Sequence, residues 1–236
     1  MKERNIYKSY LVGKNWSENF GILDDRTRRY YDIELKKIIS DLDNKNLKVL
    51  EIGFGNGGFL TYAREKNWDI YGVEINDDLI ATANEKGFQT YDSLNFFNDH
   101  TFDLIVAFDV LEHISSYDII EFVNTIKNKL KKGGYFLARF PNGDSPIGMK
   151  NQNGDITHVN AIGTEKIIQI SRICNLEIHY LGGESQIIKV KKVSETIFNL
   201  SRLILRWFIG YCIKKVYFPL TLYFFSYENL IVIFKK

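Results

Sequence analysis

A short aliphatic segment that ends in an acidic, glycine-rich turn constrains this chain more than any other feature of its sequence. Residues 47–52 form a β-branched and aliphatic run that is typical of a buried strand, and residues 51–57 read Glu-Ile-Gly-Phe-Gly-Asn-Gly. The spacing of Gly53, Gly55 and Gly58 lets a strand turn into a helix while its backbone approaches a ligand closely. The pattern therefore predicts a ligand-binding strand–turn–helix unit.

The rest of the chain alternates between strand and helix patterns. After residues 47–52, further strands are expected at 69–74, 88–91, 102–108, 135–140, 176–181 and 229–234. Helix patterns lie between most of these runs, and their expected end signals are Asn76 and Gly87, the capping box of Ser115 and Asp118, Gly133 after a lysine cluster, and Thr164. Strand–helix alternation with short connections predicts an α/β fold with a doubly wound parallel sheet.

Acidic residues lie at the carboxyl ends of three of the expected strands. Glu51, Glu74 and Asp109 all fall at carboxyl ends, which is the edge where such sheets bind ligands. Glu74 has the position of a ribose-binding acid, which fits both a nicotinamide cofactor and S-adenosylmethionine. The carboxylate of Glu51 would repel a pyrophosphate and attract the ammonium of a methionyl group, so this residue favours S-adenosylmethionine.

Three segments together resemble class I S-adenosylmethionine-dependent methyltransferases: residues 49–57, 102–114 and 130–135. The resemblance implies a Rossmann-like, seven-stranded sheet in the order 3-2-1-4-5-7-6 and S-adenosyl-L-methionine as cofactor. It implies a methionyl end formed by Glu51, Gly53, Gly55 and Gly57. The remaining cofactor-binding residues that it implies are Glu74 at the ribose with Ile75, Asp92 and Ser93 at the adenine, and Asp109 and Val110 beside the methionyl and sulfonium region.

A narrower resemblance covers residues 139–146 and 153–159, which are similar to methyltransferases found among bacterial surface-polysaccharide genes. It implies O-methylation of a sugar, or of a sugar-linked group, in a capsule or lipopolysaccharide precursor. The acceptor expected is therefore a small molecule or a glycan. The substrate-binding residues expected from these segments are Asn142, Asp144 and Asp155.

Two histidines are candidates for the base that removes a hydroxyl proton. His158 lies in the polar loop after the expected strand at residues 135–140, and His113 lies in the loop after residues 102–108. Either histidine could instead stabilise the conformation of its own loop. Asp144 and Asp155 could bind a divalent metal ion with His158, but Asx turns beside glycines explain these aspartates at least as well. We expect no metal site.

The chain is expected to be one methyltransferase domain with two additions to its core. Residues 1–45 are interpreted as a helical cover, 46–183 as the cofactor-binding core, 184–227 as a basic, aromatic helical insertion and 228–236 as the last strand. Residues 197–227 fit an amphipathic helix at an anionic membrane interface. They also fit a helical pair that packs on the sheet edge or on a second subunit of a homodimer, and this is the interpretation that the sequence favours slightly.

Composition limits the partners and the cellular compartment that are expected for this chain. A formal net charge of +2 does not indicate a nucleic-acid partner, and two cysteines without metal-type spacing fit a reducing compartment. No signal peptide and no apolar run of spanning length is recognisable. We expect a cytoplasmic protein, with peripheral attachment to the inner membrane as the alternative that the basic, aromatic insertion leaves open.

Other functions remain compatible with these patterns. The aromatic N-terminal segment could enclose a small hydrophobic acceptor such as a quinone precursor, which the enzyme would O-methylate. The fold could also serve, without catalysis, as an assembly protein docked at a membrane. A nicotinamide-dependent oxidoreductase is the alternative that the glycine loop by itself does not exclude.

Overall fold

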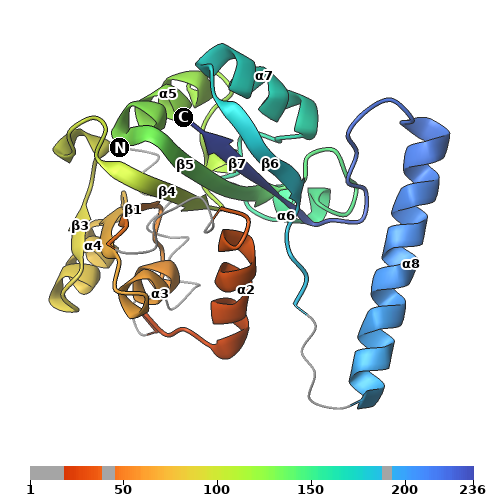
Figure 1. The fold of residues 1–236 in the computed structure, drawn as a ribbon, viewed down its shortest axis with the longest axis horizontal. Helices are drawn as coiled ribbons and strands as arrows, with labels where there is room; N and C mark the ends of the chain where they lie inside the picture. Colours follow the sequence, from red (N-terminus) through yellow and green to blue (C-terminus); the bar gives the residue numbers. More distant parts are fainter. Residues whose placement is uncertain (1–18, 39–45, 188–192) are drawn as a thin grey trace.

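The computed structural model describes residues 19–38, 46–187 and 193–236, which form a seven-stranded sheet in the order β3-β2-β1-β4-β5-β7-β6 (Figure 1). β7 runs antiparallel to its neighbours β5 and β6. The strands are β1 Lys48–Ile52, β2 Asp69–Val73, β3 Gln89–Tyr91, β4 Phe102–Phe108, β5 Leu130–Pro141, β6 Glu177–Gly183 and β7 Asn229–Lys235. The expected α/β class and the expected strand order are both confirmed.

Helices cover both faces of the sheet, because alternate residues of the central strands point to opposite sides. Val49 of β1 packs in one hydrophobic cluster with side chains of α2 (Asp25–Leu35), α3 (Gly58–Glu65) and α4 (Asp77–Glu85). Leu50 packs in a second cluster, on the other face, with side chains of α5 (Ile119–Lys129) and α7 (Thr164–Cys174). The short elements are α6 (Met149–Asn153) and the 3₁₀ turns η1 (Leu94–Phe96) and η2 (Leu111–His113). This packing leaves the carboxyl ends of the strands for the loops that build the site.

The expected N-terminal cover includes the helix α2. α2 is helical as expected, whereas residues 1–18 and 39–45 lie outside the described residues. Asn76 caps α4 as predicted, with Oδ1 accepting from the Leu79 N–H at 2.9 Å, and Gly87 follows that helix in the left-handed region.

Two predicted helix ends are wrong. α5 ends at Lys129 instead of continuing towards Gly133, because Leu130 already pairs with Phe102 as part of β5. Thr164 is the first residue of α7 and not its cap. The Asp144 carboxylate, 20 residues away in sequence, accepts from both the backbone N–H and the hydroxyl of Thr164, at 2.7 and 2.8 Å. A tertiary contact therefore replaces the local cap.

The insertion before β7 contains one long helix, α8 (Val193–Tyr217), which stands apart from the sheet on the side of the molecule opposite β3 (Figure 1). Arg206 and Ser226 exchange hydrogen bonds through their backbone carbonyls, which ties α8 to the segment that leads into β7. Exposed apolar residues of α8 include Phe198, Trp207 and Phe208. Among the described helices, none combines the length and the hydropathy that crossing a bilayer would require.

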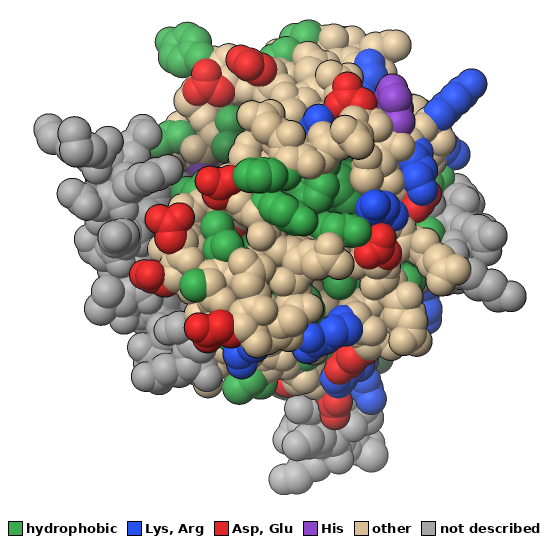
Figure 2. All heavy atoms as spheres, turned by 90° about the vertical axis from the view of Figure 1, so that its left-hand side faces the viewer, with side chains coloured by type: hydrophobic (Ala, Val, Ile, Leu, Met, Phe, Trp, Pro, Cys, Tyr) green, Lys and Arg blue, Asp and Glu red, His purple; other side chains and the backbone are tan. Residues whose placement is uncertain are grey.

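The face at the β3 edge has a different character. Figure 2 shows hydrophobic side chains gathered near its centre, with acidic and basic side chains around them. Phe96 of η1 is 64% exposed and packs against Tyr91 of β3, with ring centroids 5.1 Å apart. Exposed aromatic surface therefore borders the loops that follow β3.

Candidate active site

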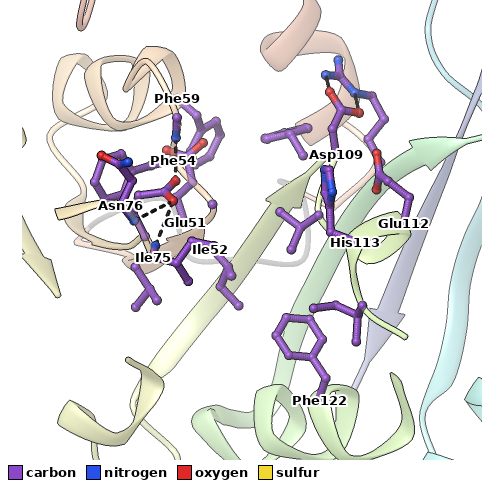
Figure 3. A pocket seen from close by; sticks show the side chains of 18 of the residues that line it. Glu51, Ile52, Phe54, Phe59, Ile75, Asn76, Asp109, Glu112, His113 and Phe122 are labelled. Atoms are coloured by element: carbon purple, nitrogen blue, oxygen red, sulfur yellow. Dashed lines mark hydrogen bonds and ion pairs between the residues drawn. The ribbon is translucent and has the colours of Figure 1, made fainter. Parts of the chain in front are cut away.

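A cavity of about 1170 Å³ opens where the carboxyl ends of β1, β2, β4 and β5 meet. Figure 3 shows Glu51, Ile75 and Asn76 on one side of it and Asp109, Glu112 and His113 on the other. Segments far apart in the chain thus face the same space. We call the first side the cofactor end and the second side the acceptor end.

The glycine loop forms part of the cofactor end. Gly53, Gly55 and Gly57 all have positive φ angles, between 48° and 70°, which allow the chain to turn sharply between β1 and α3. A Cβ atom on Gly53 would lie 2.6 Å from Cγ2 of Val110, so a side chain would fill the approach to the cavity. Gly53, Gly55 and Val110 line the cavity as expected, whereas Gly57 does not, because it packs against the ring of Phe20.

Glu51 is a buried carboxylate near the carboxyl end of β1. Its side chain is 4% exposed, and Oε2 accepts no hydrogen bond from the described residues. Burial raises the pKa of Glu51 well above its ordinary value, and the charge of Glu74 adds to the shift. An ammonium group placed here would pair with the carboxylate and remove this penalty. The site therefore fits the amino-acid end of S-adenosylmethionine.

Glu74 closes the same end from β2. Its Oε1 accepts from the backbone N–H of Ile75 at 2.8 Å, and its Oε2 accepts from that of Gly55 at 3.3 Å. Burial raises the pKa of Glu74 even though these hydrogen bonds lower it. A pair of ribose hydroxyls could donate to this carboxylate. Ile75, Asp92 and Ser93 also line the cavity, and the exposed side chain of Ile75 offers an apolar surface to a base.

Asp109 is held by a partner that the sequence patterns did not single out. Nε of Arg139 donates to Oδ1 of Asp109 at 2.9 Å, and Nη2 donates to Oδ2. Asp109 has a φ of 58°, an uncommon conformation for a residue other than glycine, and its N–H donates to the Arg139 carbonyl at 2.9 Å. The ion pair therefore fixes the start of the loop that runs over the acceptor end.

The loop after β4 and the loop after β5 meet at the acceptor end. The rings of His113 and His158 are edge-to-face with centroids 4.7 Å apart. Nδ1 of His113 contacts the Thr157 carbonyl at 3.2 Å, and Nδ1 of His158 contacts the Gln152 carbonyl at 3.1 Å. Because a carbonyl only accepts, each neutral ring carries its hydrogen on Nδ1 and a lone pair on Nε2. Burial lowers the pKa of His113, and the charge of His158 lowers it further.

Glu112 lies close to these two imidazoles. Its side chain is fully buried, and neither carboxylate oxygen accepts a hydrogen bond from another described residue. Burial raises the pKa of Glu112 to about 8, and the nearby charge of Asp109 contributes. Oε1 of Glu112 lies 3.9 Å from Nε2 of His158. The sequence placed Glu112 inside a family motif but carried no signal that its side chain would be buried.

Two of the three expected substrate residues lie elsewhere. Asp155 lines the cavity, although its Oδ1 is occupied by an Asx turn with Thr157. Asn142 and Asp144 do not line the cavity: Asn142 is fully buried and donates to the carbonyls of Phe224 and Tyr227, and Asp144 caps α7. The side chains of these two residues are engaged by hydrogen bonds within the protein. They therefore stabilise the segments around the site and are not available to a substrate.

Comparison with known proteins agrees with this architecture. A family model described as a methyltransferase domain matches residues 24–180. Phosphoethanolamine N-methyltransferase of Plasmodium falciparum is 38% identical over 90 residues, which is 34% of this chain and 34% of the relative. An uncharacterized methyltransferase of Staphylococcus carnosus is 24% identical over 133 residues, 53% of this chain and 64% of the relative. In both cases the match spans less than two thirds of the curated relative.

A solved structure extends the comparison to nearly the whole fold. The crystal structure of a SAM-dependent methyltransferase from Archaeoglobus fulgidus superposes with a TM-score of 0.63 at 21% identity, covering 89% of this chain and 94% of the other. This likeness shows the fold. The archaeal protein depends on S-adenosylmethionine, which is the cofactor expected here from Glu51 and the glycine loop.

Proposed function

Because this chain belongs to the methyltransferase domain family, we propose that it transfers a methyl group from S-adenosylmethionine to a hydroxyl of a sugar, or of a sugar-linked group, in a bacterial surface-polysaccharide precursor. The proposal rests on the division of one cavity into a cofactor end and a polar acceptor end.

The cofactor end offers groups that would complement the ammonium, the carboxypropyl chain and the ribose of the cofactor. Glu51 would pair with the ammonium, Gly53 and Gly55 would lie against the carboxypropyl chain, and Glu74 would accept from the ribose hydroxyls. Bound S-adenosylmethionine supplies a methyl group that its sulfonium already activates. The protein then has to align the acceptor and exclude water, and alignment alone is worth up to roughly 7–11 kcal/mol in ideal intramolecular systems.

The observation that carries the choice of acceptor is the polar lining of the acceptor end. Asp109, Arg139, Lys150, Asn151 and Asp155 line the cavity there and bring both hydrogen-bond donors and acceptors. A hydroxyl-rich sugar satisfies such a surface, whereas an apolar ring would leave its polar groups unpaired. This arrangement favours a glycan precursor as the acceptor.

A hydroxyl acceptor must lose its proton as the methyl group arrives. Nε2 of His113 and Nε2 of His158 are the basic atoms of the acceptor end that suit this task, because Nδ1 of each ring is engaged by a backbone carbonyl. They could act directly as a base, which is the role expected from the sequence, or through a metal ion that they bind.

Two other classes of acceptor are alternatives to a sugar. Tyr31, Phe108 and Phe122 also line the cavity and would suit a small hydrophobic acceptor of the quinone-precursor type. The relative from Plasmodium falciparum is named for an N-methylation of phosphoethanolamine, which makes a phosphorylated amine the third class. A non-catalytic assembly role is the alternative in which no acceptor is turned over.

The test is a comparison of acceptors with purified protein and methyl-labelled S-adenosylmethionine. We expect label in nucleotide sugars or lipid-linked sugars, and none above background in phenols or phosphoethanolamine. The Glu51→Gln variant serves as the control for cofactor-dependent transfer, with Glu121→Gln on the exposed side of α5 as its matched substitution. Transfer to phenols alone would replace the sugar assignment. Binding of S-adenosylhomocysteine without transfer to any of these classes would favour the assembly role.

We also propose that α8 attaches the enzyme to an anionic membrane surface, where lipid-linked precursors occur. Its exposed apolar side chains lie on the same helix as Arg202, Lys214 and Lys215. Apolar insertion and attraction to anionic headgroups reinforce each other on such a helix. A second subunit packed on α8 is the alternative, and flotation with anionic vesicles separates the two.

A further inference from the structure

We propose that Glu112, His113 and His158 bind a divalent transition-metal ion at the acceptor end of the cavity. One ligand atom from each of the three side chains lies within 4.8 Å of the others. The sequence did not predict this site, because the two histidines are 45 positions apart and Glu112 gave no sign of its burial. The proposal rests on the methyltransferase function proposed above, whose cofactor contacts it does not use.

The state of Glu112 is the first argument. A fully buried carboxyl group to which no other described residue donates a hydrogen bond is costly, since burial removes its water and no neighbouring side chain replaces it. Glu112 lines the cavity together with the two imidazoles. A cation bound between these groups would satisfy the carboxylate, and a bound cation explains why an acid occupies this position.

The orientation of the imidazoles is the second argument. His113 and His158 each direct Nδ1 to a backbone carbonyl, that of Thr157 and that of Gln152 respectively. The same contact orients metal-binding histidines in other proteins, because it holds the ring and keeps Nε2 as the nitrogen that can bind an ion. Two histidines with the same arrangement, next to an unbonded carboxylate, are better explained by a shared ion than by two separate loop contacts.

Distances decide how much the site must close. First-row metal ions take imidazole nitrogen and carboxylate oxygen at about 2.0–2.2 Å, so neighbouring ligand atoms sit about 3–3.5 Å apart. Nε2 of His158 and Oε1 of Glu112 are 3.9 Å apart, and no pair of the three exceeds 4.8 Å. Small side-chain rotations would bring them into range. Oδ2 of Asp155, also 3.9 Å from Nε2 of His158, could join directly or through water.

The ligand set selects the class of ion. Two imidazoles and one carboxylate suit Mn²⁺, Fe²⁺, Co²⁺ or Zn²⁺ and are unlike the all-oxygen sets of Mg²⁺ and Ca²⁺. Three protein ligands leave coordination positions open towards the cavity, as in catalytic metal sites. An acceptor hydroxyl bound there would become more acidic and would be held in place. The substrate class that fits is one with two adjacent oxygens, as in a sugar vicinal diol or a catechol.

The test measures binding of the metal alone to protein that has been stripped with a chelator. Titration calorimetry with Mn²⁺ and with Zn²⁺ should show one equivalent bound to the full chain. Glu112→Gln and His158→Asn should each weaken binding by more than about 100-fold, because even groups that only orient a metal ligand are worth about 10–100-fold. His100→Asn is the matched control, since His100 is not among the residues that line the cavity and has a positive φ that asparagine tolerates.

A second measurement, which uses only the wild-type protein, tests the metal site even if a variant folds poorly. Electron spin-echo spectra of the wild-type protein with Cu²⁺ should show coupling to two imidazole nitrogens. Absence of binding to wild-type protein, or equal affinity in Glu112→Gln and wild type, would overturn the proposal. Binding of S-adenosylhomocysteine, measured separately with chelator present, tests the proposed function. If the protein binds the metal ion but not S-adenosylhomocysteine, the proposed function fails and the metal site remains supported. Metal-dependent turnover of a sugar diol or of a catechol then identifies the source of the paired oxygens.

Discussion

Arg139 on β5 binds both carboxylate oxygens of Asp109 at the end of β4, with Nε 2.9 Å from Oδ1. The two residues come together because β4 and β5 are parallel neighbours in which Phe108 is in register with Arg139. Asp109 begins the loop that carries Glu112 and His113 over the cavity. The ion pair is therefore the point at which the sheet determines the position of the acceptor end.

Replacement of this arginine tests that role. We expect Arg139→Met to lower kcat/KM by about 10- to 100-fold, because charge-assisted hydrogen bonds are worth about 1.5–3 kcal/mol and the Asp109 carboxylate would lose both. Steady-state kinetics with the best acceptor of the panel measures the effect. Arg172→Met, on the exposed side of α7, is the matched control. Equal kcat/KM values for the two variants would exclude a positioning role for Arg139.

Glu51 should make the protein without cofactor less stable as the pH rises. Its folded-state pKa is raised by burial, so its contribution to stability is complete below about 4.5 and is lost as the pH rises through the folded-state value. Glu51→Gln removes this dependence. We expect the variant to melt above the wild type at pH 8 and close to it near pH 4.5, while its affinity for S-adenosylhomocysteine falls. Thermal unfolding across this pH range is the measurement, and a pH-independent difference would be inconsistent with a buried charge.

Glu74 should contribute to cofactor affinity through the ribose. Glu74→Gln keeps the shape of the side chain but removes its charge, and should raise the Kd for S-adenosylhomocysteine by about 10- to 100-fold, as expected for a lost charged hydrogen bond. Isothermal titration gives the value, and Glu85→Gln at the exposed end of α4 is the control. The same titration with NAD should show no binding; measurable NAD affinity would revive the oxidoreductase alternative.

The glycine loop allows a steric effect to be separated from a conformational one. Gly53 and Gly87 have φ angles of 68° and 79°, but a Cβ on Gly53 would meet Val110 at 2.6 Å, whereas one on Gly87 would meet nothing within 4 Å. Gly87→Ala should cost about 1–2 kcal/mol, because alanine is strained in the left-handed region. Gly53→Ala should cost more and should also weaken S-adenosylhomocysteine binding. Denaturant unfolding measures both losses; equal losses would show that the loop tolerates a side chain.

The exposed face of α8 predicts binding to anionic vesicles. The wild-type protein should float with vesicles that contain phosphatidylglycerol and not with vesicles of phosphatidylcholine alone, and salt should weaken the interaction. Replacing Trp207 and Phe208, which are 67% and 55% exposed, with serine should reduce flotation several-fold. A protein that stays off both vesicle types and runs as a dimer in light scattering would assign α8 to a subunit contact.

The sequence alone determined the cofactor end of the site. Glu51, Gly53 and Glu74 lie at or just after the carboxyl ends of recognisable strands, and in a parallel sheet these ends share one edge. The strand order followed from the family resemblance, and the structure confirms it. These features are local in the chain. The conformation of a turn and the alternation of apolar and polar side chains in a strand depend on the residues of that same segment.

Tertiary structure alone decided the acceptor end. Whether His113 meets His158, whether Glu112 is buried close to them, and whether Asp144 faces a substrate or caps α7 all depend on contacts between loops that are distant in sequence. The physical reason is that a polar side chain in a loop has no periodic pattern to say which way it points. Its partners, and therefore its pKa and its chemistry, are fixed only when the sheet brings the loops together.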